Sequence, residues 1–205
     1  MRVRRGEFIM IEPEHLLIFG SVMLVTWFLF TYNWPRMILY VFKRAILGKG
    51  FGDGPIPVNT LHSEPQTLFA DPIHPPASAS NLATTGVNRD TLLTVGVLDL
   101  SKGPQVLHVP DMNSRYYSVQ FTDPSNNTVF AYVGRRTTGT EAGDYLITGP
   151  NRKEQAPSGM KQISSPNNSV LVLGRVLVES DVDLPTAHHL AEQIRFTPLS
   201  QEGSV

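Results

Sequence analysis

The chain has 205 residues and a formal net charge of -1, and charged residues make up 17% of it, against about 25% in typical soluble domains. Glycine and proline each supply 16 residues, which is too much turn-forming sequence for a helical bundle. The near-neutral charge excludes the basic surface that binds nucleic acid. The absence of cysteine excludes disulfides, thiolate nucleophiles and cysteine-ligated metals.

After an N-terminal flank of residues 1–15, residues 16–35 form the uncharged stretch LLIFGSVMLVTWFLFTYNWP. About 20 apolar residues are enough for a helix to cross a bilayer. A cleavable signal peptide has a shorter apolar core followed by small residues, whereas this stretch ends in the bulky Tyr32 and Trp34. The pattern therefore predicts an uncleaved, single-pass transmembrane helix that anchors the chain in a lipid bilayer.

Residues 36–50 continue with apolar side chains at helical spacing and with cations on the other faces. This pattern predicts a short juxtamembrane amphipathic helix at the level of the lipid headgroups, and a solvated linker helix is the alternative. Three basic residues precede the apolar segment and four follow it. The positive-inside rule therefore leaves the orientation open.

The rest of the chain has the pattern of a β protein. Residues 51–80 are rich in proline, glycine and serine and are expected to be a linker, and residues 81–199 are expected to be one domain that ends before a short tail (200–205). Short apolar runs alternate with turn sequences, which indicates an antiparallel β-sandwich or open barrel. The stretch 185–199 predicts one short C-terminal helix. The six expected strands are residues 92–100, 105–109, 116–122, 128–134, 144–149 and 168–178.

The segment NRDTLLTVGVLDLSKGPQVLHVP (88–110) resembles the opening signature of the family called domain of unknown function 1254. The stretches 115–123, 130–150 and 165–199 continue the resemblance in the same order. Members are mainly bacterial, are commonly about twice as long, and carry a following domain of unknown function 1214. The resemblance therefore implies a stand-alone, membrane-tethered half with a separately encoded partner that carries the second domain. Export signals in longer members imply a domain on the periplasmic or extracytoplasmic side of the inner membrane.

Two polar clusters are candidates for a binding site. The first stands directly before a strongly apolar strand and consists of Asn88, Arg89, Asp90 and Thr91. The planar guanidinium of Arg89 suits a carboxylate or phosphate, with Asp90 as its orienting partner or as a general base. The alternative is an internal Arg–Asp pair that satisfies backbone groups at the start of the strand.

The second candidate is the loop RRTTGTEAG (135–143), in which Arg135, Thr137 and Thr138 offer donors for an anion. It lacks the strand-to-helix setting of a phosphate loop, and an ordered hairpin loop is the alternative. Asp123 is a further candidate, since a pair of carboxylates is what glycoside cleavage requires. The aspartates considered for such a pair are Asp90, Asp99, Asp123 and Asp144.

No metal site and no cofactor is expected. His188 and His189 are neighbours in the expected helix, where adjacent side chains point about 100° apart and do not readily ligate one ion. The chain has no Gly-x-Ser-x-Gly nucleophile elbow, so serine-based hydrolysis has no motif behind it.

Two hypotheses for function follow, and whether the protein is an enzyme stays open. In the first, the β domain is a binding and assembly module at the membrane surface. In the second, it is half of a hydrolase for a saccharide or ester whose site a partner completes. An enzyme half would gather Arg89, Asp90 and either Asp123 or Arg135 around a pocket, whereas an assembly half would expose a large apolar patch. A truncated remnant without activity is a third hypothesis.

Overall fold

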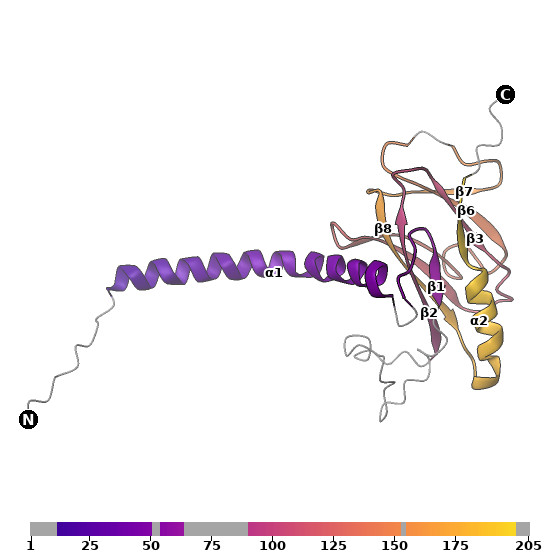
Figure 1. Ribbon diagram of the computed structural model, residues 1–205, viewed down its shortest axis with the longest axis horizontal. Helices are drawn as coiled ribbons and strands as arrows, with labels where there is room; N and C mark the ends of the chain where they lie inside the picture. The colour runs from indigo at the N-terminus through magenta and orange to yellow at the C-terminus, as the bar shows by residue number, and fades with distance from the viewer. Residues whose placement is uncertain (1–11, 51–53, 64–89, 153–154, 200–205) are drawn as a thin grey trace, which may run out of the picture.

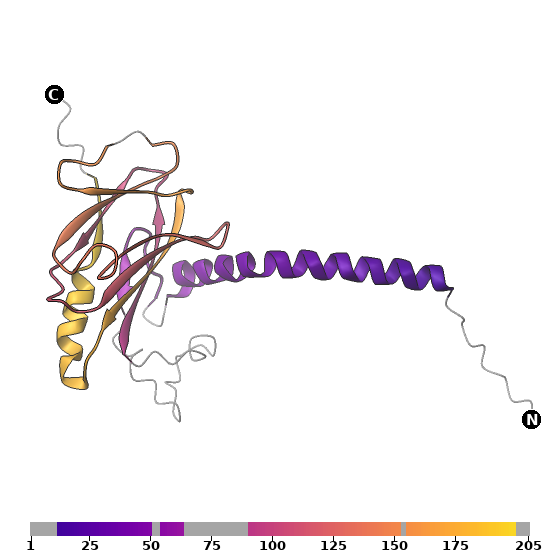
Figure 2. The same ribbon diagram turned by 180° about the vertical axis from the view of Figure 1, so that it is seen from behind.

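The structure is a computed structural model that describes residues 12–50, 54–63, 90–152 and 155–199. A long N-terminal helix projects from a β domain built of two sheets (Figures 1 and 2). The fold class expected from the sequence is confirmed: the strands are almost all antiparallel, and one short helix lies near the C-terminus.

Helix α1 runs from Pro13 to Lys49 without interruption, over 37 residues. It is long and apolar enough to cross a membrane, and none of its most apolar window is buried in the protein. The sequence predicted two segments separated at Pro35, but the helix continues through this proline. The hydroxyl of Thr31 bonds back to the carbonyl of Trp27 at 2.9 Å, as hydroxyls in apolar helices commonly do near a proline.

One sheet has five strands in the order β1-β2-β8-β4-β5, and all of its pairings are antiparallel. The other sheet has the order β7-β6-β3-β9, in which β6 and β7 run parallel. We call them sheet A and sheet B. Sheet A contains β1 (Leu61–Ser63), β2 (Thr91–Asp99), β4 (Tyr117–Asp123), β5 (Thr128–Gly134) and β8 (Ser169–Leu177). Sheet B contains β3 (Gln105–Val109), β6 (Gly143–Thr148), β7 (Lys161–Ser164) and β9 (Arg195–Pro198).

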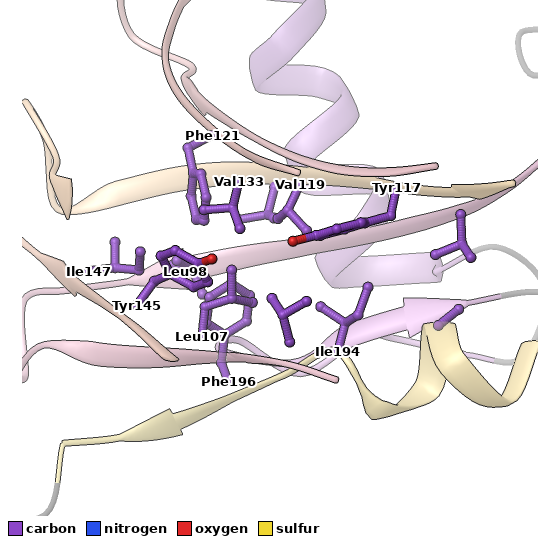
Figure 3. Close-up of a cluster of buried hydrophobic side chains, with 14 of the residues drawn as sticks. Leu98, Leu107, Tyr117, Val119, Phe121, Val133, Tyr145, Ile147, Ile194 and Phe196 are labelled. Carbon is purple, nitrogen blue, oxygen red and sulfur yellow. The ribbon is translucent and has the colours of Figure 1, made fainter. Parts of the chain in front are cut away.

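The main hydrophobic core lies between the two sheets (Figure 3). On β4 the side chains alternate: Tyr117, Val119 and Phe121 are fully buried in this core, and the residues between them face outward. Phe121 meets Phe196 of sheet B edge to face, with ring centroids 6.4 Å apart. Alternation on facing sheets closes a sandwich core of this kind. The burial of Tyr117 raises the pKa of its phenol.

The C-terminal region differs from the sequence prediction in one respect. A turn of 3-10 helix, η2 (Asp181–Asp183), leads into α2 (Leu184–Gln193). Ala187 and Ala191 of α2 belong to the main core. The last residues of the stretch expected to be helical instead form β9. Phe196 points into the core, while its neighbours Arg195 and Thr197 point outward. This alternation has the two-residue period of a strand.

A second, smaller core joins α1 to the outer face of sheet A. Ile46 is 1% exposed and packs with Ile56, Val95, Val97 and Leu171. Lys43 Nζ donates a hydrogen bond of 2.6 Å to the hydroxyl of Ser169 at the start of β8. Part of the apolar side of residues 36–49 therefore contacts protein, where the sequence pattern predicted contact with lipid headgroups.

Part of the expected linker is also built into the domain. Ile56 belongs to the second core, and β1 pairs with β2. The side chain of Asn59 accepts a hydrogen bond of 2.8 Å from the amide of Asp99. Residues 51–53 and 64–80 of this stretch lie outside the described residues.

Candidate functional site

The first predicted cluster lies at the start of β2. Asn88 and Arg89 lie outside the described residues. The carbonyl of Asp90 accepts a hydrogen bond of 2.8 Å from the amide of Val178. Thr91 is buried, and its hydroxyl accepts a bond of 3.4 Å from Arg175. The described part of the cluster thus satisfies backbone and side-chain groups where β2 begins.

The second predicted cluster forms the turn after β5. The hydroxyl of Thr138 accepts a hydrogen bond of 3.1 Å from the amide of Gly134, and the hydroxyl of Thr137 lies 3.1 Å from the carbonyl of Tyr132. Arg135 uses its backbone amide on β4, and its side chain is exposed. The threonine hydroxyls therefore stabilise their own turn, and the arginine side chain remains open to solvent.

Asp123 lies at the opposite end of sheet A. Its side chain is only 1% exposed and accepts three hydrogen bonds, from the amide of Ser125 (2.8 Å) and from the side chains of Asn126 (2.8 Å) and Asn167 (2.7 Å). A carboxylate held in this way closes the β4–β5 turn and ties it to the segment before β8.

The strand register shows how far apart these residues are. Thr91 pairs with Leu177 at the end of β8, whereas Thr122, next to Asp123, pairs with Leu171 near its start. Arg135 follows β5 at the same end as Thr91, about 14 Å away across three strand spacings. The structure therefore divides the described members of the predicted site between the two ends of sheet A.

The outer face of sheet B carries a polar cluster that the sequence analysis did not assemble. His108 Nδ1 lies 2.7 Å from Asp144 Oδ1, and its Nε2 lies 2.6 Å from Thr197 Oγ1. The register places Asp144 and Arg195 directly opposite His108 on the two neighbouring strands. The side chains of His108 and Asp144 are 30% and 49% exposed.

This cluster has the order of a carboxylate, an imidazole and a hydroxyl. With the Nδ1 proton held by Asp144, Nε2 of His108 is the acceptor for the hydroxyl proton of Thr197. Such an arrangement orients the imidazole and draws proton density from the hydroxyl, which is how a nucleophilic hydroxyl is activated. The side chains belong to three adjacent strands, and their sequence separations of 36 and 89 residues hid the cluster.

A second polar contact missed in the sequence ties the loop before β4 to η2. Arg115 donates to Asp183 through its two terminal guanidinium nitrogens, at 2.5 and 2.7 Å, and to the carbonyl of Leu177 at 2.7 Å. The hydrogen bonds from Arg115 lower the pKa of Asp183, and the carboxylate in turn raises the pKa of Arg115. The pair is mostly buried and joins elements of the fold, so its role is structural.

Two other kinds of site, a metal site and a large apolar patch on the β domain, are not evident among the described residues. Among them, no group of three or more histidine, aspartate or glutamate side chains is arranged to hold a metal ion. The large apolar side chains that are exposed in the described part of the β domain are spread over several segments rather than gathered in one. They are Val58, Val129, Tyr132 and Val182.

These features define a two-sheet β domain carried on a long apolar helix. Residues 71–198 match the family described as "protein of unknown function (DUF1254)", and the chain belongs to that family. The resemblance stated from the sequence is confirmed. No curated protein matches the chain.

The solved structures that are similar to it include two from bacteria. The VPA0106 protein of Vibrio parahaemolyticus is 22% identical, with a TM-score of 0.60 over 83% of this chain and 36% of that one. An uncharacterised protein from Burkholderia cenocepacia is 11% identical, with a TM-score of 0.36 over 58% of this chain and 31% of the other. The Vibrio protein supports the fold alone, and this chain spans about a third of its length.

Proposed function

We propose that this chain is a membrane-anchored binding and assembly module. Helix α1 spans the inner membrane of a bacterial cell and holds the β domain on the periplasmic or extracytoplasmic side. The partner is a separately encoded protein that carries the domain of unknown function 1214. The observation that carries the proposal is the second core, in which α1 packs directly on the outer face of sheet A.

This packing leaves the outer face of sheet B as the surface for a partner. The inner faces of both sheets close the main core, and α1 covers part of the outer face of sheet A. The outer face of sheet B presents the polar and charged His108, Asp144, Arg195 and Thr197, while Val106 and Leu146 on the same face are buried. The large apolar patch expected of an assembly half is not found among the described residues of the β domain, so the proposed contact with the partner is a polar one, like the rim of an interface between separately folded chains.

The experiment is affinity purification of the tagged full-length chain from its native membrane in mild detergent, followed by mass spectrometry. Stoichiometric recovery of a protein with the second family domain is the expected result. The variant Arg195→Glu reverses one charge on the outer face of sheet B and should abolish recovery, whereas Arg135→Glu, an equal change on a loop of sheet A, should not. Recovery of the chain alone from native membranes would overturn the proposal.

A second candidate function, ester hydrolysis, is favoured by the cluster of Asp144, His108 and Thr197. Thr197 Oγ1 would attack the ester carbonyl while its proton passes to His108 Nε2, and the same proton would leave with the alcohol. Water, deprotonated by His108, would then cleave the acyl-threonine to release the acid and restore the hydroxyl. The cluster supplies an activated hydroxyl rather than two facing carboxylates, which favours an ester over a saccharide.

The flat outer face of a sheet supplies no enclosed pocket by itself, so activity is to be sought in the complex with the partner. The assay is hydrolysis of p-nitrophenyl acetate by the purified complex, with acylation mapped by mass spectrometry. Thr197→Val and His108→Ala should abolish acylation, whereas Thr128→Val, on the edge strand of sheet A, should leave it unchanged. Turnover that is equal in Thr197→Val and the unaltered complex would exclude this function.

A further inference from the structure

The last four turns of α1 have two different faces. One face carries Leu39, Phe42 and Ile46, which contact sheet A in the second core. The opposite face carries Met37 and Val41, which are 47% and 58% exposed and contact no core of the β domain. These two residues continue the spacing of Phe30 and Trp34 at intervals of four, three and four residues. The opposite face is therefore an unbroken extension of the apolar surface of the expected membrane span.

Two arginines of this segment lie against aromatic rings. Arg36 lies over the ring of Tyr32 at 4.5 Å and donates a hydrogen bond of 3.2 Å to its hydroxyl. The guanidinium of Arg44 lies 5.6 Å from the centroid of the Tyr40 ring. Arginine with an aromatic ring is typical of the interface between lipid and water. The end of α1 therefore has the side chains of a segment at this interface.

A tilted helix brings one of its faces deeper into the bilayer than the opposite face. Transmembrane helices are tilted by about 20° on average, within a range of about 0 to 40°. When α1 tilts toward the face of Met37 and Val41, that face turns toward the bilayer and the face of Ile46 turns away from it.

We propose that the end of α1 is wedged between the β domain and the bilayer, with Met37 and Val41 buried in lipid and sheet A resting on the opposite face. The proposal rests on the membrane anchoring proposed above and adds the contact that fixes the domain against the membrane surface. Arg44 and Lys49 then lie at the level of the phosphates of anionic lipids.

Lipid, rather than a second protein, is the occupant that the surroundings favour. The exposed face is continuous with the apolar segment of α1, none of whose most apolar window is buried in the protein. Between residues 36 and 50 every charged side chain is a cation, which suits anionic headgroups and would repel a second copy of the same helix. Aromatic Trp34 and Tyr40 flank the stripe, as they do at membrane interfaces.

The absence of cysteine in the chain allows one label at a chosen position. Full-length Val41→Cys, Phe30→Cys and Val58→Cys variants are spin-labelled and reconstituted in vesicles of phosphatidylcholine and phosphatidylglycerol at seven to three. Collision rates with oxygen, which concentrates in lipid, and with a water-soluble nickel chelate are then compared. Phe30 serves as the position within the span, and Val58, an exposed residue of the β domain, as the position in water.

The expected result is an oxygen-to-nickel ratio at position 41 that is severalfold higher than at position 58 and close to that at position 30. A ratio at position 41 equal to that at position 58, with position 30 still in lipid, overturns the wedge and leaves the anchoring intact. An aqueous ratio at position 30 as well overturns the anchoring itself. Circular dichroism of each labelled variant identifies any that has not folded, and Met37→Cys then serves as the replacement for Val41→Cys.

Discussion

The docking of α1 on sheet A is tested most directly at Ile46. This side chain is 1% exposed and lies among Ile56, Val95, Val97 and Leu171. Ile46→Ala removes three carbons, worth about 0.8 kcal/mol each, or about 2.4 kcal/mol. A cavity that relaxes only in part adds to this loss, so the expected cost is about 3 kcal/mol.

The assay is hydrogen exchange of the full-length chain in detergent, followed at the amide of Ile56. This amide donates a hydrogen bond of 3.2 Å to the carbonyl of Ile46 and so reports the contact itself. If the helix detaches locally, a loss of about 3 kcal/mol lowers the protection of this amide roughly a hundredfold. If helix and sheet unfold together, the same loss lowers the melting temperature by about 10 °C.

The matched control is Val41→Ala, a similar truncation on the same helix at a side chain that points away from the sheet. A change within about 0.5 kcal/mol is expected there. If Ile46→Ala leaves both the protection of the Ile56 amide and the melting temperature indistinguishable from Val41→Ala, the second core does not hold the helix, and the reasoning fails.

Three further substitutions test the β domain. Asp183→Asn should destabilise it by about 2 kcal/mol at pH 7, because it breaks the paired contact with Arg115. Since Arg115 lowers the folded pKa of Asp183, this stabilisation is present above the unfolded pKa of about 3.9 and is lost as the pH falls below it. Urea unfolding at pH 7 and pH 3 should show the difference between the proteins shrink, and an unchanged difference would contradict the pairing. Thr94→Val should stabilise by about 1 kcal/mol, because the Thr94 hydroxyl is buried and has no hydrogen-bond partner among the described residues; a lower melting temperature would count against this. Asp123→Ala should cost about 3 kcal/mol by leaving its three donors without an acceptor, and a change below about 0.5 kcal/mol in urea unfolding would refute the role assigned to it.

The strands that the sequence predicted are those with long apolar runs. β2 and β8, each of nine residues, combine apolar side chains with flanking turn sequences. β1, β7 and β9 were missed because each has only three or four residues and few apolar side chains. Short edge strands of this kind are fixed by the sheet they join and carry little periodic signal of their own.

The contacts of the candidate site depend on register, which the sequence did not supply. Asp144 was noticed as a chemically capable side chain, but nothing in its local sequence placed it on the strand beside His108. Asp123 was also noticed as a carboxylate that could act in a site, yet in the structure it accepts three hydrogen bonds from other groups of the β domain. A polar residue next to a turn can either bind a ligand or close the turn, and only its hydrogen-bond partners distinguish the two roles.

The apolar spacing of residues 36–49 is ambiguous in a similar way, because it fits contact with protein as well as contact with lipid. Different faces of this one helix fit the two partners. Spacing alone does not tell a sheet from a lipid acyl chain as the apolar partner. The structure assigns the face of Ile46 to the sheet, while the face of Val41 remains exposed as it is in the expected span. Helical periodicity was therefore predicted correctly, and the partner of one face was not.

The consequence for function concerns orientation. A flexible linker directly after the membrane segment would let the β domain sample many directions and heights above the bilayer. Instead the domain meets α1 through the second core, and Asn59 is pinned to β2 by a 2.8 Å bond from its amide to the carbonyl of Val97. Sheet B is on the far side of the sandwich from this junction (Figure 2). Its outer face is therefore held at a fixed angle to α1, and the partner proposed above would meet His108 and Arg195 without the entropic cost of first orienting the domain.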